Sequence, residues 1–343
     1  MTTQLLEKLI SIPSFSREEA AAADYLYSRL WGEGLNPHRK GNNIWCECGS
    51  GSGSSSTVLL NAHIDTVKPC GGWTLNPFEP VLEGDKLFGL GSNDDGGSLI
   101  ALLESFKALS QKQLPYRLVF SATAEEEVSG TGGLEQLFPE IGPIDYAIIG
   151  EPTGMQMGIA ERGLMVLDCT AKGVGGHAAH PDCAVNAIYK ALEDIEIIRS
   201  IKFDKVSPLL GPVGINVTQI NAGSAHNVIP AECSFVVDVR SNGLYSNKEL
   251  LEAISGAVSC EVKARSTRLE SSNIAPEHPL VQKGKALGLE TFGSATLSNC
   301  AICPFPAVKM GPGDTCRSHK ADEYILLSEI SAAIDIYIKL LTP

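Results

Sequence analysis

The sequence predicts an α/β protein in which helices flank a mixed sheet and a smaller α+β layer is inserted into the chain. Three observations lead to this prediction. Apolar strands alternate with helical stretches over the first part of the chain, the pattern changes from about Arg162, and the earlier rhythm returns beyond about Ser266. We therefore expect one domain formed by residues 1–161 and 267–343, and a second formed by residues 162–266.

The first domain is expected to open with two helices. Pro13 ends the first helix, and the spacing of Ser16 and Glu19 is that of a capping box, which starts an Ala-rich helix running to about Gly32. The remaining elements follow from apolar periodicity and from Gly and Pro. They are strands at 43–48, 58–63, 116–122, 145–149 and 306–310, an apolar helix after Gly97, a final helix at 326–341, and loops at 49–56 and 69–80.

The inserted layer is expected to contain two helices and about four strands. Its clearest elements are strands at 164–171, 213–220 and 233–239 and helices at 183–201 and 247–258. This order is typical of a compact α+β unit with a core of its own.

The composition excludes two classes of protein. The formal net charge of -13 argues against a nucleic-acid binder, which needs a basic face. No apolar run reaches the length of about 18 residues that a membrane span needs, and the N-terminus lacks the pattern of a secretory signal. Ten cysteines in a chain of this size indicate reduced thiols in the cytoplasm. Cys300 and Cys303 form a lone Cys-x-x-Cys, which lacks the second pair of a zinc knuckle, so most cysteines are predicted to be buried apolar side chains.

One apolar strand ends in a histidine and an aspartate. The run that begins at Val58 stops at His63, and Asp65 follows on the same side of an extended chain. A neutral imidazole can bind a metal, and Asp65 could hold the other ring nitrogen. The alternative is an ordinary surface turn, since most histidines at strand ends are only hydrogen-bonded.

Other expected strands lead into acidic residues. Three glutamates at 125–127 follow the strand at 116–122, and Glu151 follows the strand at 145–149. Consecutive glutamates repel one another unless a cation lies among them, although a solvated charge run is the usual alternative. Because α/β sheets place their sites at the carboxyl ends of strands, we expect these acids to converge with His63.

Such a set of ligands suits the hydrolysis of an amide. This reaction needs a nucleophile at neutral pH and a group that holds the developing oxyanion, and two zinc ions about 3.5–4 Å apart supply both. A bridging carboxylate with one histidine and one acid on each side forms an economical shell. Shells rich in carboxylates accept cobalt and manganese as well.

The motifs resemble, in order and spacing, the co-catalytic zinc aminoacylase and carboxypeptidase family. They are His63-x-Asp65-Thr66, Asp94 before a glycine pair, Glu126-Glu127, Gly-Glu151-Pro-Thr and Ser-His319. Acetylornithine deacetylase, succinyl-diaminopimelate desuccinylase and glutamate carboxypeptidase belong to this family, and the likeness covers essentially the whole chain. It implies a zinc-exopeptidase-like mixed sheet flanked by helices, with an inserted α+β lid and dimerisation domain.

The resemblance also implies a set of metal ligands. Asp94 would bridge two zinc ions, His63 and Glu151 would complete one of them, and Glu127 and His319 would complete the other. Without the resemblance, an acid such as Asp94 before a helix has an alternative role, in which its negative charge complements the helix dipole.

Two further acids would act beside the ions. Glu126 would be the general base that takes a proton from the metal-bridging water and passes it to the leaving amine. The alternative for Glu126 is another metal ligand. Asp65 would orient His63.

The inserted layer would supply residues to the site of a partner subunit in a homodimer. The resemblance implies that His177 stabilises the oxyanion from across the interface, that Asn227 also acts there, and that Arg240 pairs with the α-carboxylate of the substrate. His180 is expected to be a surface residue. Arg162 is a further candidate for substrate binding, with a structural salt bridge as the alternative.

The resemblance points to a deacylase that releases the α-amino group of an N-acyl amino acid. The short lid and the run at 306–315 look most like acetylornithine deacetylase-like proteins, so the expected substrates are N-acetyl- or N-succinyl-ornithine or -citrulline in arginine biosynthesis. A metallo-dipeptidase or tripeptidase, or a succinyl-diaminopimelate desuccinylase, is the alternative. Many relatives carry Asp-x-Lys-Gly-Gly where this chain has Asp94-Asp95-Gly96-Gly97-Ser98, which places the chain in an atypical branch.

Two other classes are disfavoured. A non-catalytic binding protein on the same scaffold would be expected to have lost a ligand or the base, and all are present. No Gly-x-Ser-x-Gly elbow of a serine hydrolase occurs.

Overall fold

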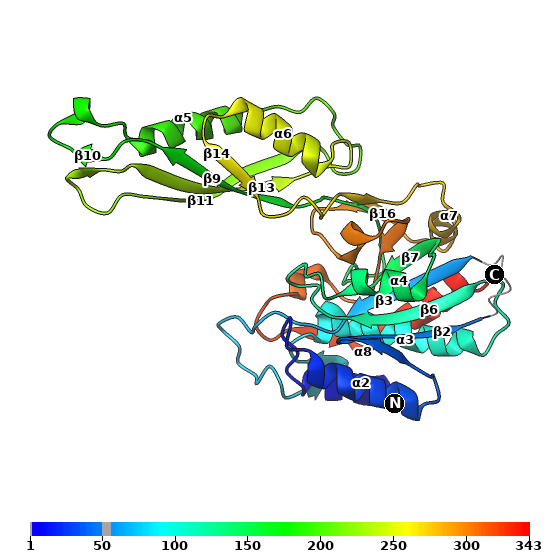
Figure 1. Ribbon diagram of the computed structural model, residues 1–343. Coiled ribbons are helices and arrows are strands. Elements are labelled where there is room, and N and C mark those ends of the chain that lie inside the picture. The colour runs from blue at the N-terminus through cyan, green and yellow to red at the C-terminus, as the bar shows by residue number, and fades with distance from the viewer. Residues whose placement is uncertain (1, 50–55) are drawn as a thin grey trace. The chain divides into compact units, whose positions relative to one another are not determined.

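The computed structural model describes residues 2–49 and 56–343, and these form two compact units (Figure 1). Unit 1 contains Met1–Ile159, Asn273–Phe292 and Ser298–Pro343, and unit 2 contains Ala160–Ser272 and Gly293–Leu297. The boundaries predicted at 161/162 and 266/267 lie close to these divisions. Most of the loop predicted at 49–56 lies outside the described residues.

A mixed sheet forms the centre of unit 1. Strand β3 (Thr57–His63) lies between β6 (Arg117–Thr123) and β7 (Tyr146–Ile149) and is parallel to both. On the far side of β7, β17 (Ala307–Lys309) continues the parallel arrangement. Antiparallel strands extend the sheet at both ends. They are β1 (His38–Lys40) and β2 (Asn43–Cys48) beyond β6, and β8 (Met157–Glu161) beyond β17, with β15 (Ser272–Asn273) and β16 (Thr291–Ser294) next to β8.

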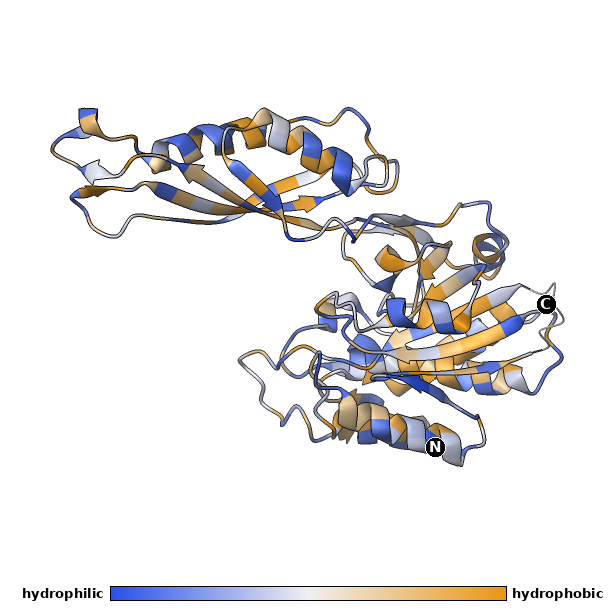
Figure 2. Ribbon diagram, in the orientation of Figure 1, coloured by the Kyte–Doolittle hydropathy of each residue, from blue (hydrophilic) through white to orange (hydrophobic). Residues whose placement is uncertain are grey.

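The central strands are buried on both faces, which is why they read as continuous apolar runs. In β3, Val58 and Leu60 pack into the larger core, while Leu59 between them packs into the core on the opposite face. In β6, Phe120 and Val119 divide in the same way. Figure 2 shows this central region as predominantly hydrophobic. The alternation fixes the register of these strands, because a shift by one residue would exchange the two faces.

Helices cover the sheet and carry the larger core. The long helices are α1 (Thr2–Ile10), α2 (Ala20–Gly32), α3 (Gly97–Ser110) and α8 (Leu327–Leu341). The shorter elements of this unit are α4 (Phe138–Ile141), α7 (Pro279–Ala286) and a small sheet of β4 (Val81–Glu83), β5 (Lys86–Phe88) and β18 (Tyr324–Leu326). Sequence periodicity did not reveal these shorter elements, because helices of four to eight residues and strands of three residues are too short to show a clear period.

The predicted capping box at the start of α2 was wrong. The helix begins at Ala20, and the residue before it, Glu19, makes no side-chain cap. The hydroxyl of Ser16 instead donates to the carboxylate of Asp65 at 2.7 Å. The local pattern was outweighed by a contact between residues far apart in the sequence.

Unit 2 contains the predicted two helices and a four-stranded antiparallel sheet. The strand order is β11 (Gly214–Ala222), β13 (Glu232–Arg240), β9 (Met165–Lys172) and β14 (Glu261–Ala264), packed with α5 (Ala187–Ser200) and α6 (Asn247–Ala257). A separate ribbon pairs β10 (Gly176–His177) with β12 (Val228–Ile229). Helix α5 starts later than expected, because Asn186 caps it and residues 181–183 form a short 3₁₀ turn.

Among the described residues, no helix combines the length and the apolar character needed to cross a membrane.

Candidate metal centre

Three parallel strands bring the first ligands together. β3 ends at His63, and its neighbours β6 and β7 are followed by Glu126, Glu127 and Glu151. Since the strands are parallel neighbours, their carboxyl ends meet at one edge of the sheet. The side chain of His63 is 2% exposed and that of Glu127 is 8% exposed, so the group lies largely out of solvent.

Asp94 lies between the two histidines of the predicted shell. Its Oδ1 is 3.2 Å from Nε2 of His63, and its Oδ2 is 3.7 Å from Nε2 of His319. Nε2 of His319 is also 3.0 Å from Oε2 of Glu127. A carboxylate with a different histidine at each oxygen has the geometry of a ligand that bridges two ions.

Two groups of candidate ligands share His63. In each group the ligand atoms lie within 4.8 Å of one another; one group adds Asp94 and Glu127, and the other adds Glu126 and Glu151. All five predicted ligands are therefore connected by these groups and by the contacts of His319. Glu126 lies where either a base or an additional ligand would lie, so both interpretations of this residue stay open.

The hydrogen bonds of His63 favour a cation beside it. Nδ1 of His63 donates to the main-chain carbonyl of Asp65 at 2.9 Å, while the carboxylate of Asp65 is 3.5 Å away. With this assignment Nε2, which faces the carboxylate of Asp94, holds either a proton or a metal ion. Two acceptors at that distance repel each other unless a positive charge lies between them. The imidazole and carboxylate donors are those that divalent transition metals take in proteins.

Burial shifts the pKa values of the acids in the centre. Burial and the charge of Glu127 raise the pKa of Glu126 to about 8. Burial also raises the pKa of Glu151 well above its usual value, and the buried Lys309, whose Nζ is 3.7 Å from Oε2 of Glu151, opposes this shift. Without a cation these acids therefore tend to hold protons, and bound cations would favour their charged forms.

The two histidines are shifted in the direction of the charged form. Burial alone would lower the pKa of His63, but Asp65 and Asp94 raise it well above its usual value. The hydrogen bond to Glu127 raises the pKa of His319 to about 9. Without a metal these histidines therefore hold protons that an ion would displace.

Three buried carboxylates hold the loops that carry the ligands. Asp65 accepts the backbone N–H groups of Glu126 and Glu127, both at 3.0 Å. Glu19 accepts the N–H of Glu125 at 3.2 Å. Glu323 accepts three backbone N–H groups from the segment that contains Asp94. Sequence reasoning missed both Glu19 and Glu323.

Glu323 holds the segment that contains Asp94, the candidate bridging residue. Its carboxylate accepts the N–H groups of Gly91 at 3.0 Å and of Asn93 and Asp94 at 2.9 Å. The side chain is buried, and burial raises its pKa to about 7 in spite of these three hydrogen bonds. The only signal in the sequence is a glutamate four residues after His319, which does not by itself indicate this contact.

We expect Glu323→Gln to weaken metal binding and to lower the free energy of unfolding by about 1.5–3 kcal/mol, because an amide would turn N–H donors toward backbone N–H groups. Titration of the apoprotein with metal at pH 8 and chemical denaturation would measure the two effects. Asp322→Asn is the matched control, since the carboxylate of Asp322 binds Thr74 and Leu75 at the surface. Equal metal affinity in both variants would contradict the role of Glu323.

The metal-free protein is expected to lose stability as the pH rises. The pKa of Glu126 is raised from 4.5 to about 8, so its contribution is present below pH 4.5 and is lost as the pH rises through 8. Glu323, raised to about 7, and His319, raised from 6.5 to about 9, act in the same direction. Bound cations replace these protons, so the metal-loaded protein should not show the loss. Melting temperatures measured with and without a chelator across this range would test it; a chelated protein that gains stability would contradict it.

Gly96 occupies the position at which the family resemblance implies a lysine. A Cβ at this position would lie 2.4 Å from the carbonyl oxygen of Gly91 and 2.6 Å from Cδ1 of Leu6. The carbonyl belongs to the backbone and cannot move alone. The absence of the lysine is therefore part of the packing of α1 against this segment.

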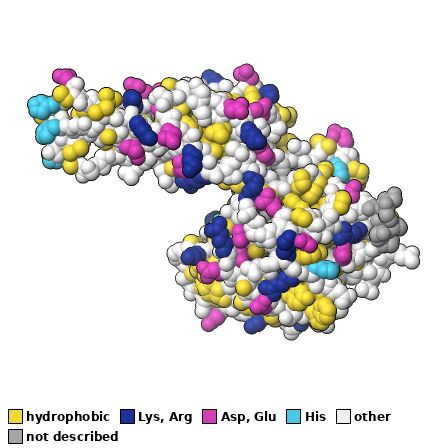
Figure 3. All heavy atoms as spheres, in the orientation of Figure 1, with side chains coloured by type: hydrophobic (Ala, Val, Ile, Leu, Met, Phe, Trp, Pro, Cys, Tyr) yellow, Lys and Arg dark blue, Asp and Glu magenta, His cyan; other side chains and the backbone are white. Residues whose placement is uncertain are grey.

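The candidates for the partner's site lie in unit 2. His177 is exposed, and its Nδ1 accepts the N–H of Ala179 at 3.1 Å, which leaves Nε2 as a hydrogen-bond donor. The carbonyl of Asn227 accepts the N–H of Ala178, so the two predicted residues lie on facing segments. His180 is exposed as expected. Figure 3 shows histidine side chains gathered at this end of unit 2, near β10.

The two arginines of unit 2 are engaged within the unit. The guanidinium of Arg240 makes a bidentate pair with Asp238, with N–O distances of 2.8 and 3.0 Å. Asp238 and Arg240 are two residues apart in a strand and share a face, so this pairing was visible in the sequence. The guanidinium of Arg162 donates to the main-chain carbonyls of Leu210 and Pro212. These contacts are structural, but they are hydrogen bonds to carbonyl groups and not the predicted salt bridge.

All ten cysteines are in the thiol form. Cys300 is buried and Cys303 is half-buried. Neither belongs to a candidate metal group among the residues that the structure describes.

Comparisons with known proteins agree with this centre. The sequence model of the family described as Peptidase family M20/M25/M40 matches residues 59–342. Succinyl-diaminopimelate desuccinylase of Buchnera aphidicola subsp. Acyrthosiphon pisum (strain Tuc7) is 34% identical over 271 residues, which cover 74% of this chain and 71% of the relative. Acetylornithine deacetylase of Proteus mirabilis (strain HI4320) is 28% identical over 358 residues, covering 94% and 91%.

Solved structures share the fold. A tripeptidase of Staphylococcus aureus matches with a TM-score of 0.80 and 20% identity, covering 99% of this chain and 96% of the other. A dinuclear metal-binding peptidase of Bacillus subtilis from the M20 family matches with a TM-score of 0.74 and 15% identity, covering 99% and 96%.

The family match spans most of the chain, and it includes the strand ends and loops that carry the candidate ligands. The fold class and the family expected from the motifs are thereby confirmed. The chain belongs to peptidase family M20/M25/M40 and is a metal-dependent amidohydrolase.

Proposed function

We propose that the protein hydrolyses the amide bond of an N-acyl amino acid, with N-acetyl- or N-succinyl-ornithine or -citrulline as substrate and a place in arginine biosynthesis. The observation that carries the proposal is the position of Asp94, whose two oxygens face different histidines in a buried, carboxylate-rich centre. The relative named acetylornithine deacetylase, which aligns over nearly the whole chain, supports the choice of substrate.

The ions proposed for the centre are two zinc ions, with cobalt or manganese as substitutes. His63 and Glu151 would hold one, Glu127 and His319 the other, and Asp94 both. Bound there, the ions would polarise the substrate carbonyl and lower the pKa of a water molecule. The dinuclear relative of known structure supports the number of ions.

Glu126 moves the proton in this proposal. Its carboxylate takes a proton from the attacking water as the new C–O bond forms, and it delivers that proton to the nitrogen as the C–N bond breaks. The products are a carboxylate and a free α-amino group. A pKa raised by burial suits a group that must both accept and release a proton near neutral pH.

We further propose a homodimer in which His177 and Asn227 act in the partner's site. Nε2 of His177 is a free donor at an exposed position, as an oxyanion donor delivered to another subunit must be. Unit 2 also has features of an interface: β11 is an edge strand with Ile220 53% exposed, and α5 leaves Tyr189 67% and Leu192 53% exposed. Ten cysteines in the thiol form support a cytoplasmic location.

Arg240 and Arg162 both bind other residues of unit 2, which makes them weaker candidates for substrate binding. Arg240 would have to bind the α-carboxylate through the part of its guanidinium that Asp238 does not use. Arg240→Lys tests this directly: a rise in KM with little change in kcat would support substrate binding.

A second substrate is favoured by a specific observation. Relatives named succinyl-diaminopimelate desuccinylase include the one that is 34% identical. Purified protein loaded with zinc should therefore be offered N-acetylornithine, N-succinylornithine, N-acetylcitrulline, N-succinyl-diaminopimelate and simple dipeptides. The highest kcat/KM on an ornithine or citrulline derivative is the expected result. Turnover of dipeptides alone would reject the proposal in favour of the peptidase, and turnover of none would reject all of the proposed substrates.

A further inference from the structure

One buried asparagine links the segments that carry two of the candidate ligands. Asn93 precedes Asp94 and is fully buried. Its Nδ2 donates to the main-chain carbonyl of Asp314 at 3.1 Å and to the hydroxyl of Ser318 at 3.2 Å, and its Oδ1 accepts the N–H of Asp314 at 3.1 Å. Because the backbone of Asp314 supplies one donor and one acceptor, the orientation of the amide is fixed. Both partners lie in the loop that leads to His319.

The amide of Asn93 holds both ends of a short turn. Thr315–Arg317 form a 3₁₀ turn, which the carboxylate of Asp314 caps, and Ser318 follows the turn. Asn93 therefore binds the residue before the turn and the residue after it. This close approach depends on Gly313, where a Cβ would lie 2.3 Å from Oδ1 of Asn93.

His319 depends on this loop for its position. Its side chain is 53% exposed, so packing does not hold it, and its backbone has a φ of +59°, which residues other than glycine seldom adopt. Ser318 also makes a side-chain hydrogen bond to the carboxylate of Asp94. A chain of hydrogen bonds thus runs from the amide of Asn93 through the hydroxyl of Ser318 to the carboxylate that faces His319.

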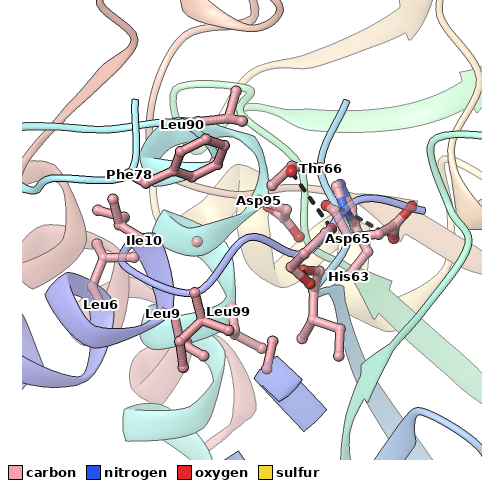
Figure 4. Close-up of a pocket in the computed structure, with 16 residues that line it drawn as sticks. Leu6, Leu9, Ile10, His63, Asp65, Thr66, Phe78, Leu90, Asp95 and Leu99 are labelled. Carbon is pink, nitrogen blue, oxygen red and sulfur yellow. Dashed lines mark hydrogen bonds and ion pairs between the residues drawn. The ribbon is translucent and has the colours of Figure 1, made fainter. Parts of the chain in front are cut away.

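Packing leaves the segment around Asn93 some room to shift. Figure 4 shows a largely apolar cavity beside this segment, which Leu90 and Asp95 line together with Leu6 and Ile10 of α1. Its volume is about 30 Å³, enough for a water molecule, and closely packed interiors contain few such voids. The position of the segment therefore depends on its hydrogen bonds more than on its contact with α1.

We propose that Asn93 is a positioning residue that sets the separation between Asp94 and His319, and with it the affinity of the ion held by His319 and Glu127. The inference rests on the two-ion centre proposed above. Among side chains of this size, only asparagine offers the two donors and the acceptor that the loop uses, since aspartate lacks the N–H groups and leucine lacks all three.

The test titrates the metal-free protein with cobalt, whose visible absorption spectrum reports the ligands of each ion. We expect two ions in the wild type. In Asn93→Ala the dissociation constant of one ion should rise by about 10–100-fold, the usual effect of losing a residue that supports a metal ligand. The other ion should keep its affinity, because among the described residues the amide makes no hydrogen bond to His63 or Glu151. The spectrum of the remaining ion should match that of His319→Ala, which loses the same ion.

Asn247→Ala is the matched control. Asn247 is also fully buried, and its amide donates to two main-chain carbonyls of unit 2, those of Thr267 at 3.3 Å and Leu269 at 2.8 Å. This change should lower the melting temperature and leave both affinities unchanged. Equal weakening of both ions in Asn93→Ala, or no weakening, would overturn the inference and leave the two-ion centre standing. Fewer than two ions in the wild type would refute both.

Ser318→Ala keeps the test decisive if Asn93→Ala does not fold. Ser318 is half-buried, and the change removes the hydroxyl that joins the amide of Asn93 to Asp94. We expect the dissociation constant of the same ion to rise by about fivefold, the effect of one hydrogen bond. An unchanged dissociation constant in Ser318→Ala would overturn the inference.

Discussion

Glu126→Gln is expected to lower kcat by a factor of about 10²–10⁴, the range for the loss of a general acid–base group. The amide keeps the size of the side chain but cannot accept the proton of the attacking water. The backbone N–H of residue 126 still binds Asp65, so the loop should stay in place. Steady-state kinetics on the best substrate and metal analysis of the same sample measure the two quantities.

The metal content decides between the two interpretations of Glu126. A base predicts two ions per chain with low kcat, whereas a ligand predicts the loss of an ion. Glu127→Gln is the matched comparison, since its carboxylate contacts His319 and the change should lower the affinity of an ion. Unchanged turnover in Glu126→Gln would remove this residue from the mechanism.

His177→Ala is expected to lower kcat by about 10²–10³ without loss of metal, the cost of removing one oxyanion donor. KM should change less, because the donor acts on charge that develops in the transition state. His180→Ala is the control: its ring centroid lies 6.1 Å from that of His177, it is equally exposed, and it should retain activity.

A mixture of two inactive variants tests action across the interface. When His177→Ala and Glu126→Gln chains form mixed dimers, one of the two sites combines an intact Glu126 with an intact His177 from the other chain. Random mixing should restore about a quarter of wild-type activity. Verified mixed dimers that stay inactive would place His177 in the site of its own chain.

The positions of the candidate ligands could be predicted where they follow apolar strands that lie side by side in the sheet. His63 and Glu151 end or follow buried apolar strands, and parallel neighbours must bring such ends together. His319 has no such signal, since it lies in a loop between short strands. The prediction that His319 is a metal ligand rests on the family resemblance alone.

The contacts that hold the loops could not be predicted. Glu323 binds residues more than 200 positions earlier in the chain, and no local pattern encodes a carboxylate that accepts distant backbone N–H groups. The same reason explains the failed capping box, in which Ser16 bonds to Asp65. Arg240 differs, because its pairing with Asp238 follows from strand geometry, which places residues two apart on one face.

The hydrogen bonds of Asp65, Glu19 and Glu323 have a consequence for how the enzyme acquires its ions. Hydrogen bonds from backbone N–H groups to these three carboxylates hold the loops at residues 91–94 and 125–127. Folding can therefore precede loading, and one ion can be exchanged for another without unfolding the chain. Which metal the enzyme carries in the cell would then depend on supply and affinity at a preformed site.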